Sequence, residues 1–310
     1  MKIIQSTEIE PISEETSQII RHVERRVSRV QPSELAAYKR LSRRLDSIPD
    51  AQKGYEWDRA YILLNAHFKK NANETHMRLS RLVNTQADKD FMDKAKEFQN
   101  SVFEKLHPYT LTTHNYSLAF TERDKESIAL SLQRIMNTLA QAGYQSFINS
   151  GTLLGAVRDG KFIPHDDDLD IAVLVKGESD NELAEEWLKL KNFLVDNDLL
   201  ASHAYRKPLM KLKWNEGLDL DIFPVWIRKG KIYIYPHTFG ELSEHEVFPL
   251  KSTLLEGVEL PSPSMPDRML ALNYGPSWNT PDRSFRFPWA EAHRKFRRAR
   301  RAIFHKLQSE

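Results

Sequence analysis

The stretch NSGTLLGAVRDGKFIPHDDDLDIAVLV, residues 149–175, decides the fold of the second half of the chain. Four acids fall within five positions, Asp166, Asp167, Asp168 and Asp170, and an apolar run follows them. This run predicts a strand, on which side chains alternate between the two faces. Asp168 and Asp170 therefore share one face, while the apolar residues beside them face the core.

A second acidic strand is predicted in GLDLDIFPVW, residues 217–226, where Asp219 and Asp221 share one face. If this strand lies beside the first, one of its acids completes a site of three carboxylates. That acid would bridge a metal or accept the proton of an attacking hydroxyl. Taken alone, such a strand also fits an ordinary polar sheet face.

Carboxylates so close together repel one another, and their pKa values rise unless a cation lies between them. Hard oxygen ligands favour Mg²⁺, or Mn²⁺, over zinc, and Mg²⁺ usually completes its coordination with phosphate oxygens of a substrate. The expected cofactor is therefore Mg²⁺ or Mn²⁺, and the expected chemistry involves phosphate.

Basic and loop residues near the acids are the candidates for substrate binding. Ser150, Gly151 and Thr152 are predicted to lie between a short strand and a short helix, where backbone N–H groups favour an anion. Arg158 and Lys161 follow this loop and are candidates for phosphate contact or for surface ion pairs. We expect the same of Lys211 and Lys213, which share a strand face before the second acidic strand.

After residue 116, short predicted strands alternate with predicted helices, and this order predicts a mixed sheet. Before residue 108, apolar residues recur at spacings of three and four, which predicts a helical region starting after Ser13. We therefore expect an α+β protein with a helical N-terminal domain at 1–115 and a catalytic domain at 116–292. In the catalytic domain, helices should flank the mixed sheet. Residues 260–289, rich in Pro, Trp and Tyr, predict an irregular covering segment.

Residues 293–310 form a separate basic tail in this prediction, with seven basic residues and one acid. Apolar residues recur in the tail at helical spacing and indicate an amphipathic helix. Such a helix either packs through its apolar stripe or contacts anionic lipid headgroups.

Composition narrows the function classes. The 310 residues include 45 basic and 43 acidic side chains and no cysteine, which excludes disulfide scaffolds, thiol nucleophiles and cysteine-bound zinc. A net charge of +2 gives little support to a nucleic-acid partner. No signal peptide and no run of about 18 apolar residues is present, so we expect a cytoplasmic protein, with peripheral contact at the inner membrane face through the tail.

Three segments in this order resemble the LicD/fukutin family of phosphotransferases, which has the nucleotidyltransferase fold: GTLLGAVRDGKFIPHDDDLDI, DLDIFPVW and ALNYGPSWNTP. The resemblance spans about residues 122–289. It implies transfer of a phosphorylated alcohol, such as phosphocholine, ribitol phosphate or glycerol phosphate, from a cytidine-diphosphate (CDP) donor to a sugar hydroxyl, with release of CMP. The implied acceptors are glycans of capsule, teichoic acid or lipopolysaccharide, or their lipid-linked precursors.

The resemblance also assigns residues. Gly151 and Thr152 match the family's phosphate loop, Asp168 and Asp170 match its metal-binding pair, and Asp221 matches the third carboxylate. Asp166 corresponds to a further acid of the motif, whereas His165 stands where the family usually has Trp. Tyr274 and Trp278 resemble the closing motif, for which structural packing is the preferred interpretation.

Two alternative functions stay open. The same acids can transfer a nucleoside monophosphate from a nucleoside triphosphate, with release of pyrophosphate instead of CMP. The chain can also retain the fold without catalysis and act as a scaffold in glycan assembly, although the presence of all three matched acids weighs against this.

Overall fold

The computed structural model describes residues 12–85, 88–112, 115–164, 166–203, 208–213, 218–282, 285 and 287–308. The chain forms two compact units, Met1–Ala119 and Phe120–Glu310. The division lies four residues beyond the predicted boundary at 115. The tail at 293–310 is not a separate part, because it belongs to the second unit.

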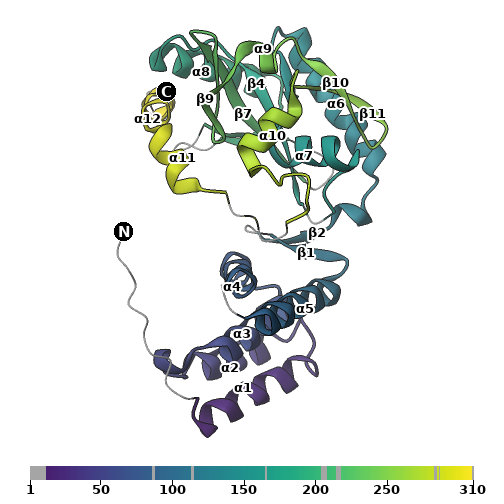
Figure 1. Ribbon diagram of the computed structural model, residues 1–310, viewed down its shortest axis with the longest axis vertical. Helices are drawn as coiled ribbons and strands as arrows, with labels where there is room; N and C mark the ends of the chain where they lie inside the picture. The colour runs from purple at the N-terminus through teal and green to yellow at the C-terminus, as the bar shows by residue number, and fades with distance from the viewer. Residues whose placement is uncertain are drawn as a thin grey trace. The chain divides into compact units, whose positions relative to one another are not determined.

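The first unit consists of helices followed by a two-stranded hairpin (Figure 1). Its described elements are α1 (Glu14–Val27), α2 (Leu35–Asp46), the 3-10 turn η1 (Asp50–Gln52), α3 (Tyr55–Phe68), α4 (Ala72–Asn84), α5 (Lys89–Leu106), β1 (Tyr109–Leu111) and β2 (Tyr116–Leu118). Helix α1 begins as predicted, because the Ser13 side chain accepts a hydrogen bond from the Thr16 N–H. The predicted helical region is confirmed, and the hairpin β1–β2 occupies the Thr-rich segment after it.

Helix α3 is the centre of the first unit and packs against α1, α2, α4 and α5. It also carries a buried carboxylate, Asp58, which is 4% exposed. Arg78 and Arg81 of α4 each lie 2.6 Å from an Asp58 oxygen. A buried charge is tolerated only when it is paired in this way, so the Asp58 pairs fix α4 on α3.

Replacing Asp58 by Ala should lower the free energy of unfolding by about 3 kcal/mol, because Arg78 keeps a largely buried charge and loses a partner. Asp90→Ala is the matched control, since Asp90 pairs with Lys94 on the surface and its removal should change stability only slightly. Urea unfolding followed by circular dichroism measures both. Equal losses in the two variants would contradict a structural role for the buried pair.

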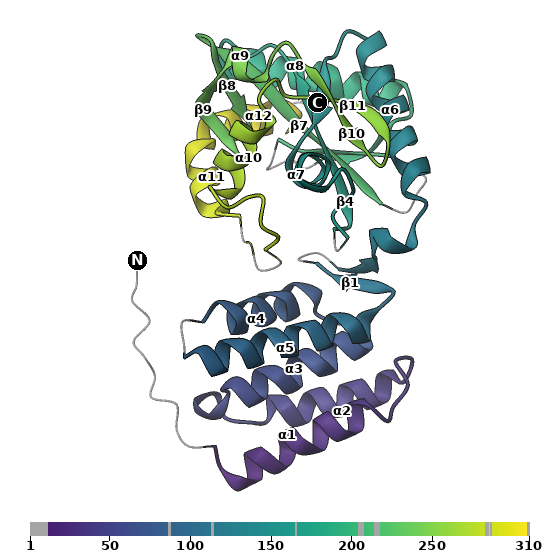
Figure 2. The ribbon, with the colours of Figure 1, turned by 45° about the vertical axis from the view of Figure 1, so that its right-hand side comes forward.

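The second unit is a mixed sheet with helices around it (Figures 1 and 2). Its helical elements in the described part are η2 (Phe120–Glu122), α6 (Lys125–Gln141), α7 (Ser150–Asp159), α8 (Asp180–Asp196), α9 (Glu244–Val247), α10 (Pro266–Tyr274), α11 (Trp289–Lys295) and α12 (Arg297–Gln308). Its strands there are β3 (Ser146–Ile148), β4 (Asp168–Leu174), β5 (Leu200–His203), β6 (Met210–Leu212), β7 (Asp219–Arg228), β8 (Lys231–Ile234), β9 (Thr238–Ser243), β10 (Lys251–Leu255) and β11 (Val258–Ser262).

Strand β7 is central to the seven-stranded sheet that the described residues form. The order is β3-β4-β7-β6-β5, and β8 and β9 extend the sheet from the second half of β7. Only the β4–β7 pair of this sheet is parallel among the described strands, with Asp168 opposite Asp219 and Asp170 opposite Asp221. Strands β10 and β11 form a separate antiparallel hairpin. The predicted α+β fold with a mixed sheet flanked by helices is confirmed.

Residues 260–289 are more regular than the sequence predicted. They contain α10, which begins at Pro266, a residue whose fixed φ suits the first helical turn. Met269, Leu270 and Asn273 of α10 are buried, so tertiary packing accounts for a helix that the density of Pro and aromatic residues obscured.

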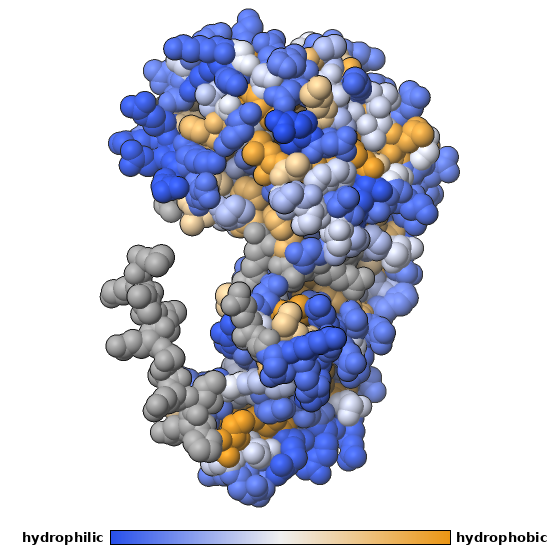
Figure 3. Space-filling model, in the orientation of Figure 1, coloured by the Kyte–Doolittle hydropathy of each residue, from blue (hydrophilic) through white to orange (hydrophobic). Residues whose placement is uncertain are grey.

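The basic tail is helical, as predicted, and its apolar stripe is packed. Phe296, Ala299, Ile303 and Leu307 are buried in the core of the second unit, and α12 lies against α8 (Figure 1). In the view of Figure 3 the surface of this unit is mostly hydrophilic, with small hydrophobic patches. Among the described residues, no helix is both long enough and apolar enough to cross a bilayer.

Candidate active site

The parallel register of β4 and β7 brings the predicted carboxylates together. Residues opposite one another on neighbouring strands point to the same face of a sheet. Oxygens of Asp168, Asp170 and Asp221 all lie within 4.8 Å of one another, and we call these residues the acidic triad. Asp219 is 62% exposed at its side chain, so Asp221 is the acid of the second strand that completes the triad.

The triad is largely buried, and its carboxylates repel one another. Asp170 and Asp221 are 8% and 6% exposed. Burial raises the pKa of Asp170 well above its usual range, and the charges of Asp168 and Asp221 raise it further. Such a set of carboxylate oxygens fits a hard divalent cation such as Mg²⁺, whose charge removes this repulsion.

Asp166 adds a fourth carboxylate to this region. Its oxygens lie within 4.8 Å of those of Asp167 and Asp168. Burial raises the pKa of Asp166, and the nearby Asp168 charge adds to the effect. Asp166 therefore belongs to a second group of carboxyls beside the triad that has the geometry to bind a cation.

Of the two lysines predicted to face substrate, the structure brings only Lys211 to the acids. Its Nζ donates to Asp219 at 2.7 Å and to Asp221 at 2.8 Å. Burial lowers the pKa of Lys211, but the hydrogen bonds to the two carboxylates raise it by more. Lys213 instead pairs with the exposed Asp198, which follows α8.

The turn at the start of α7 is joined to β4 by three hydrogen bonds to Asp170. The Asn149 N–H donates to the Asp170 backbone oxygen at 2.9 Å. The Gly151 N–H donates to Asp170 Oδ2 at 3.2 Å, and the Asp170 N–H donates to Thr152 Oγ1 at 2.8 Å. The predicted phosphate loop therefore also holds a member of the triad in place.

Gly151 is needed for this close approach. A Cβ atom at this position would lie 2.5 Å from Asp166 Oδ2, well inside van der Waals contact. The sequence did not reveal this steric reason for a glycine at position 151, and its predicted role in phosphate binding stays a prediction.

Arg158 and Lys161 lie further along the same segment. Arg158 is in the last turn of α7, with its side chain 10% exposed, and pairs with Asp159 at 2.7 Å. Lys161 is exposed in the loop that follows. Substrate contact by either stays a prediction. His165 lies outside the described residues.

Sequence reasoning missed His237, which is 87 positions from Ser150 in the chain. Its Nε2 lies 3.0 Å from Ser150 Oγ. Burial lowers the pKa of His237 to about 4, so the imidazole is neutral at pH 7. No local motif marks this histidine, because it precedes β9 and reaches α7 only through the tertiary fold.

Tyr274, assigned to packing from the sequence, packs against the core and also lies near the acids. Burial raises its pKa, and the charges of Asp170, Asp166 and Asp168 raise it further. Its ring centroid is 6.2 Å from that of His237. Trp278 packs against the core of the unit, in agreement with the preferred interpretation.

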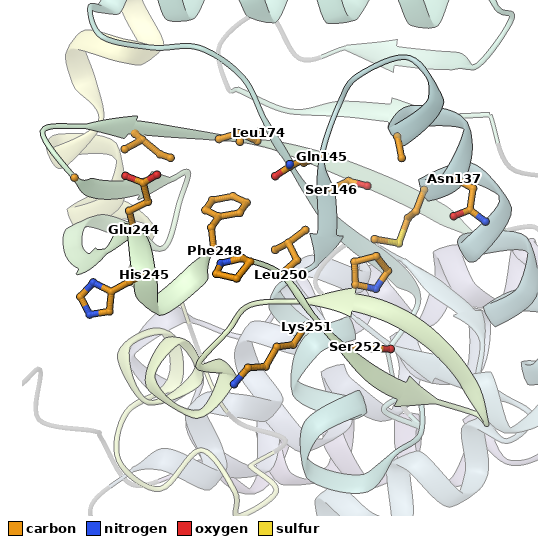
Figure 4. A pocket seen from close by; sticks show the side chains of 16 residues that line it. Asn137, Gln145, Ser146, Leu174, Glu244, His245, Phe248, Leu250, Lys251 and Ser252 are labelled. Carbon is orange, nitrogen blue, oxygen red and sulfur yellow. The ribbon is translucent and has the colours of Figure 1, made fainter.

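One large cavity lies away from the acids. It measures about 1130 Å³ and is lined by Leu174 and Ile227, near the C-terminal ends of β4 and β7, together with residues of α6, α9 and β10 (Figure 4). The triad lies at the N-terminal ends of the same two strands. The chemistry of the acids therefore identifies the candidate active site, and cavity size does not.

Replacing Gly151 by Ala should weaken Mn²⁺ binding by about tenfold, because the added methyl displaces Asp166 or the turn that holds Asp170. Calorimetric titration with Mn²⁺ measures the effect. Gly143→Ala is the control, since nothing lies within 4 Å of its Cβ and its positive φ gives a backbone penalty of about 1 kcal/mol. Unchanged Mn²⁺ binding in Gly151→Ala would show that the acids do not depend on this contact.

Comparison with known proteins agrees with the resemblance drawn from the motifs. Residues 143–265 match the family model described as LicD/FKTN/FKRP, nucleotidyltransferase domain. An uncharacterized protein of Rickettsia prowazekii is 34% identical over 164 residues, which cover 49% of this chain and 56% of that protein. A protein of Rickettsia typhi, also uncharacterized, is 31% identical over 166 residues, which cover 51% and 49%.

The ribitol 5-phosphate transferase FKRP of Homo sapiens is 24% identical over 148 residues, which cover 46% of this chain and 30% of FKRP. The chain thus spans about half the length of the rickettsial relatives and less of FKRP. Among solved structures, the lincomycin-bound lincosamide antibiotic adenylyltransferase LnuA aligns with a TM-score of 0.33 and 15% identity, over 56% of this chain and 96% of that one.

Proposed function

Since residues 143–265 match the nucleotidyltransferase domain of the LicD/FKTN/FKRP family, we propose that this chain transfers a phosphorylated alcohol from a CDP-activated donor to a hydroxyl group of a glycan or of its lipid-linked precursor. The acidic triad beside the start of α7 is the observation that carries this proposal. The likeness to FKRP, a ribitol 5-phosphate transferase, makes ribitol phosphate the first group to test. Phosphocholine and glycerol phosphate are the other candidates.

In the proposed reaction, an acceptor oxygen attacks the phosphorus that carries the alcohol. A new O–P bond forms, the bond between the two phosphates breaks, and CMP leaves with the electron pair. The proton of the glycan hydroxyl passes to a carboxylate of the site. Asp221 is the proposed general base that takes this proton or, in the alternative, a ligand of the metal.

Asp168, Asp170 and Asp221 would hold Mg²⁺ or Mn²⁺, which when bound supplies neutralisation of the phosphate charge. The start of α7 orients an anion through its dipole and backbone N–H groups. Lys211 holds one positive charge beside Asp221 and can contact the donor phosphates. Most of the proposed rate acceleration is positioning and electrostatic stabilisation.

A panel of CDP-ribitol, CDP-glycerol, CDP-choline, CTP, UTP and ATP tests the donor. One CDP-alcohol should raise the melting temperature of the chain with Mg²⁺ and not with chelator, because a ligand that binds the native state stabilises it. The same compound should then release CMP in the presence of a glycan acceptor. Stabilisation by a triphosphate alone, with release of pyrophosphate, would replace this proposal with nucleotidyl transfer.

Asp170→Asn tests the triad itself. It should lower CMP release by about a hundredfold or more and abolish the Mg²⁺-dependent rise in melting temperature. In chelator it should raise the melting temperature above that of the wild type, because one of several buried like charges is removed. Asp198→Asn, an exposed aspartate paired with Lys213, is the control and should match the wild type.

We further propose that the basic face of α12 contacts anionic lipid headgroups near a lipid-linked acceptor. The apolar stripe of α12 is buried, so this contact would be electrostatic and not an insertion into the acyl chains. Arg297, Arg298 and Arg301 are exposed on the outer face.

The triple variant Arg297→Glu, Arg298→Glu, Arg301→Glu should weaken binding to phosphatidylglycerol vesicles by at least about a hundredfold, at about 1 kcal/mol per residue. Sedimentation with vesicles measures it, and binding of the wild type should disappear in 1 M salt, where the screening length is about 3 Å. The same charge reversals at Lys39, Arg40 and Arg43 of α2 are the control. An equal loss of vesicle binding in the α2 variant would show that binding depends on the net charge of the chain and not on α12.

A further inference from the structure

The first residue of α7, Ser150, has a strained backbone. Its φ is +44°, in the left-handed region that residues with a Cβ rarely adopt, and it is 7% exposed. Non-glycine residues keep this conformation only where their surroundings enforce it, and such strain is concentrated at functional sites. Ser150 lies between Asn149 and Gly151, both of which donate a backbone hydrogen bond to Asp170.

His237 is the group that fixes the Ser150 side chain. Its Nε2 is 3.0 Å from Ser150 Oγ, and its other nitrogen, Nδ1, is buried without a hydrogen-bond partner among the described residues. The ring is also held from one side by Phe287, at a centroid distance of 4.5 Å. Among the described residues, the imidazole therefore has one hydrogen-bond contact, to the serine hydroxyl, and the tautomer of the ring decides which group donates.

The unpartnered Nδ1 indicates the tautomer. A buried N–H without an acceptor is less tolerable than a buried nitrogen lone pair without a donor. The proton of the neutral ring is then on Nε2, which donates to Ser150 Oγ. In this arrangement the Ser150 hydroxyl hydrogen is not used by His237.

We propose that His237 is a positioning residue that donates from Nε2 to Ser150 Oγ and so leaves the Ser150 hydroxyl to donate to a phosphate oxygen of the donor. This inference rests on the proposed function, which supplies a diphosphate at the triad. Ser150 is adjacent to Gly151, whose N–H binds Asp170, so its hydroxyl belongs to the same turn that holds the acids. His237 acts on the phosphate only through this hydroxyl.

Inorganic pyrophosphate with Mg²⁺ is the probe, because it contains the diphosphate without the base or the alcohol. In calorimetric titrations of the full chain, Ser150→Ala and His237→Phe should each weaken pyrophosphate binding by about tenfold, as expected for a hydrogen bond to a charged group. His237→Gln should stay within about threefold of the wild type, because its amide can still donate to Ser150 Oγ.

The double variant separates positioning from a general structural role. Ser150→Ala with His237→Phe should bind pyrophosphate no more weakly than Ser150→Ala alone, because the histidine acts through the hydroxyl. Mn²⁺ binding and the melting temperature should stay close to those of the wild type in His237→Gln. His245→Phe is the matched control, since His245 forms a second Ser–His contact, with Ser243 at 3.3 Å, and should leave pyrophosphate binding unchanged.

Wild-type affinity in His237→Phe, or additive losses in the double variant, would overturn the inference. If the wild type binds pyrophosphate as described but releases no CMP from any CDP-alcohol, the positioning role stands and the proposed function fails. If the wild type with Mg²⁺ releases CMP from a CDP-alcohol but does not bind pyrophosphate, the positioning role is overturned and the proposed function stands.

Discussion

Repulsion among buried carboxylates is the constraint on which the rest of the second unit depends. Asp168, Asp170 and Asp221 lie within 4.8 Å of one another, and burial raises the pKa of Asp170 in addition to the effect of its neighbours. Such an arrangement persists only where packing holds it, because each charged group would gain from moving into water. The strongly apolar strands β4 and β7 supply that packing, since their other residues are almost all buried.

The turn between β3 and α7 is the second part of this frame. Three hydrogen bonds join residues 149–152 to Asp170, and the glycine within the turn leaves room for Asp166. The same turn presents the positive end of α7 to the site. This short segment thus holds Asp170 in place, and the strained backbone of Ser150 lies at its centre.

A charged side chain is buried and paired in the helical unit, whereas charged side chains on α12 are exposed. Asp58 is buried and held by two arginines, so its charge serves the packing of α3 and α4. On α12 the apolar residues are buried and the arginines at 297, 298 and 301 are exposed, so its charge is presented to the surroundings. The described residues form three separate apolar cores, two in the helical unit and one in the second unit.

The sequence by itself determined the helical region, the mixed sheet and the acids that form the triad, because period-two alternation and short spacing are local properties of the chain. It did not determine α10, the placement of Lys211 on Asp221, or the contact of His237 with Ser150. These depend on which strands pair and which helices pack against them. Residues 87 positions apart, such as Ser150 and His237, are brought together by the tertiary fold, and no local pattern carries that information.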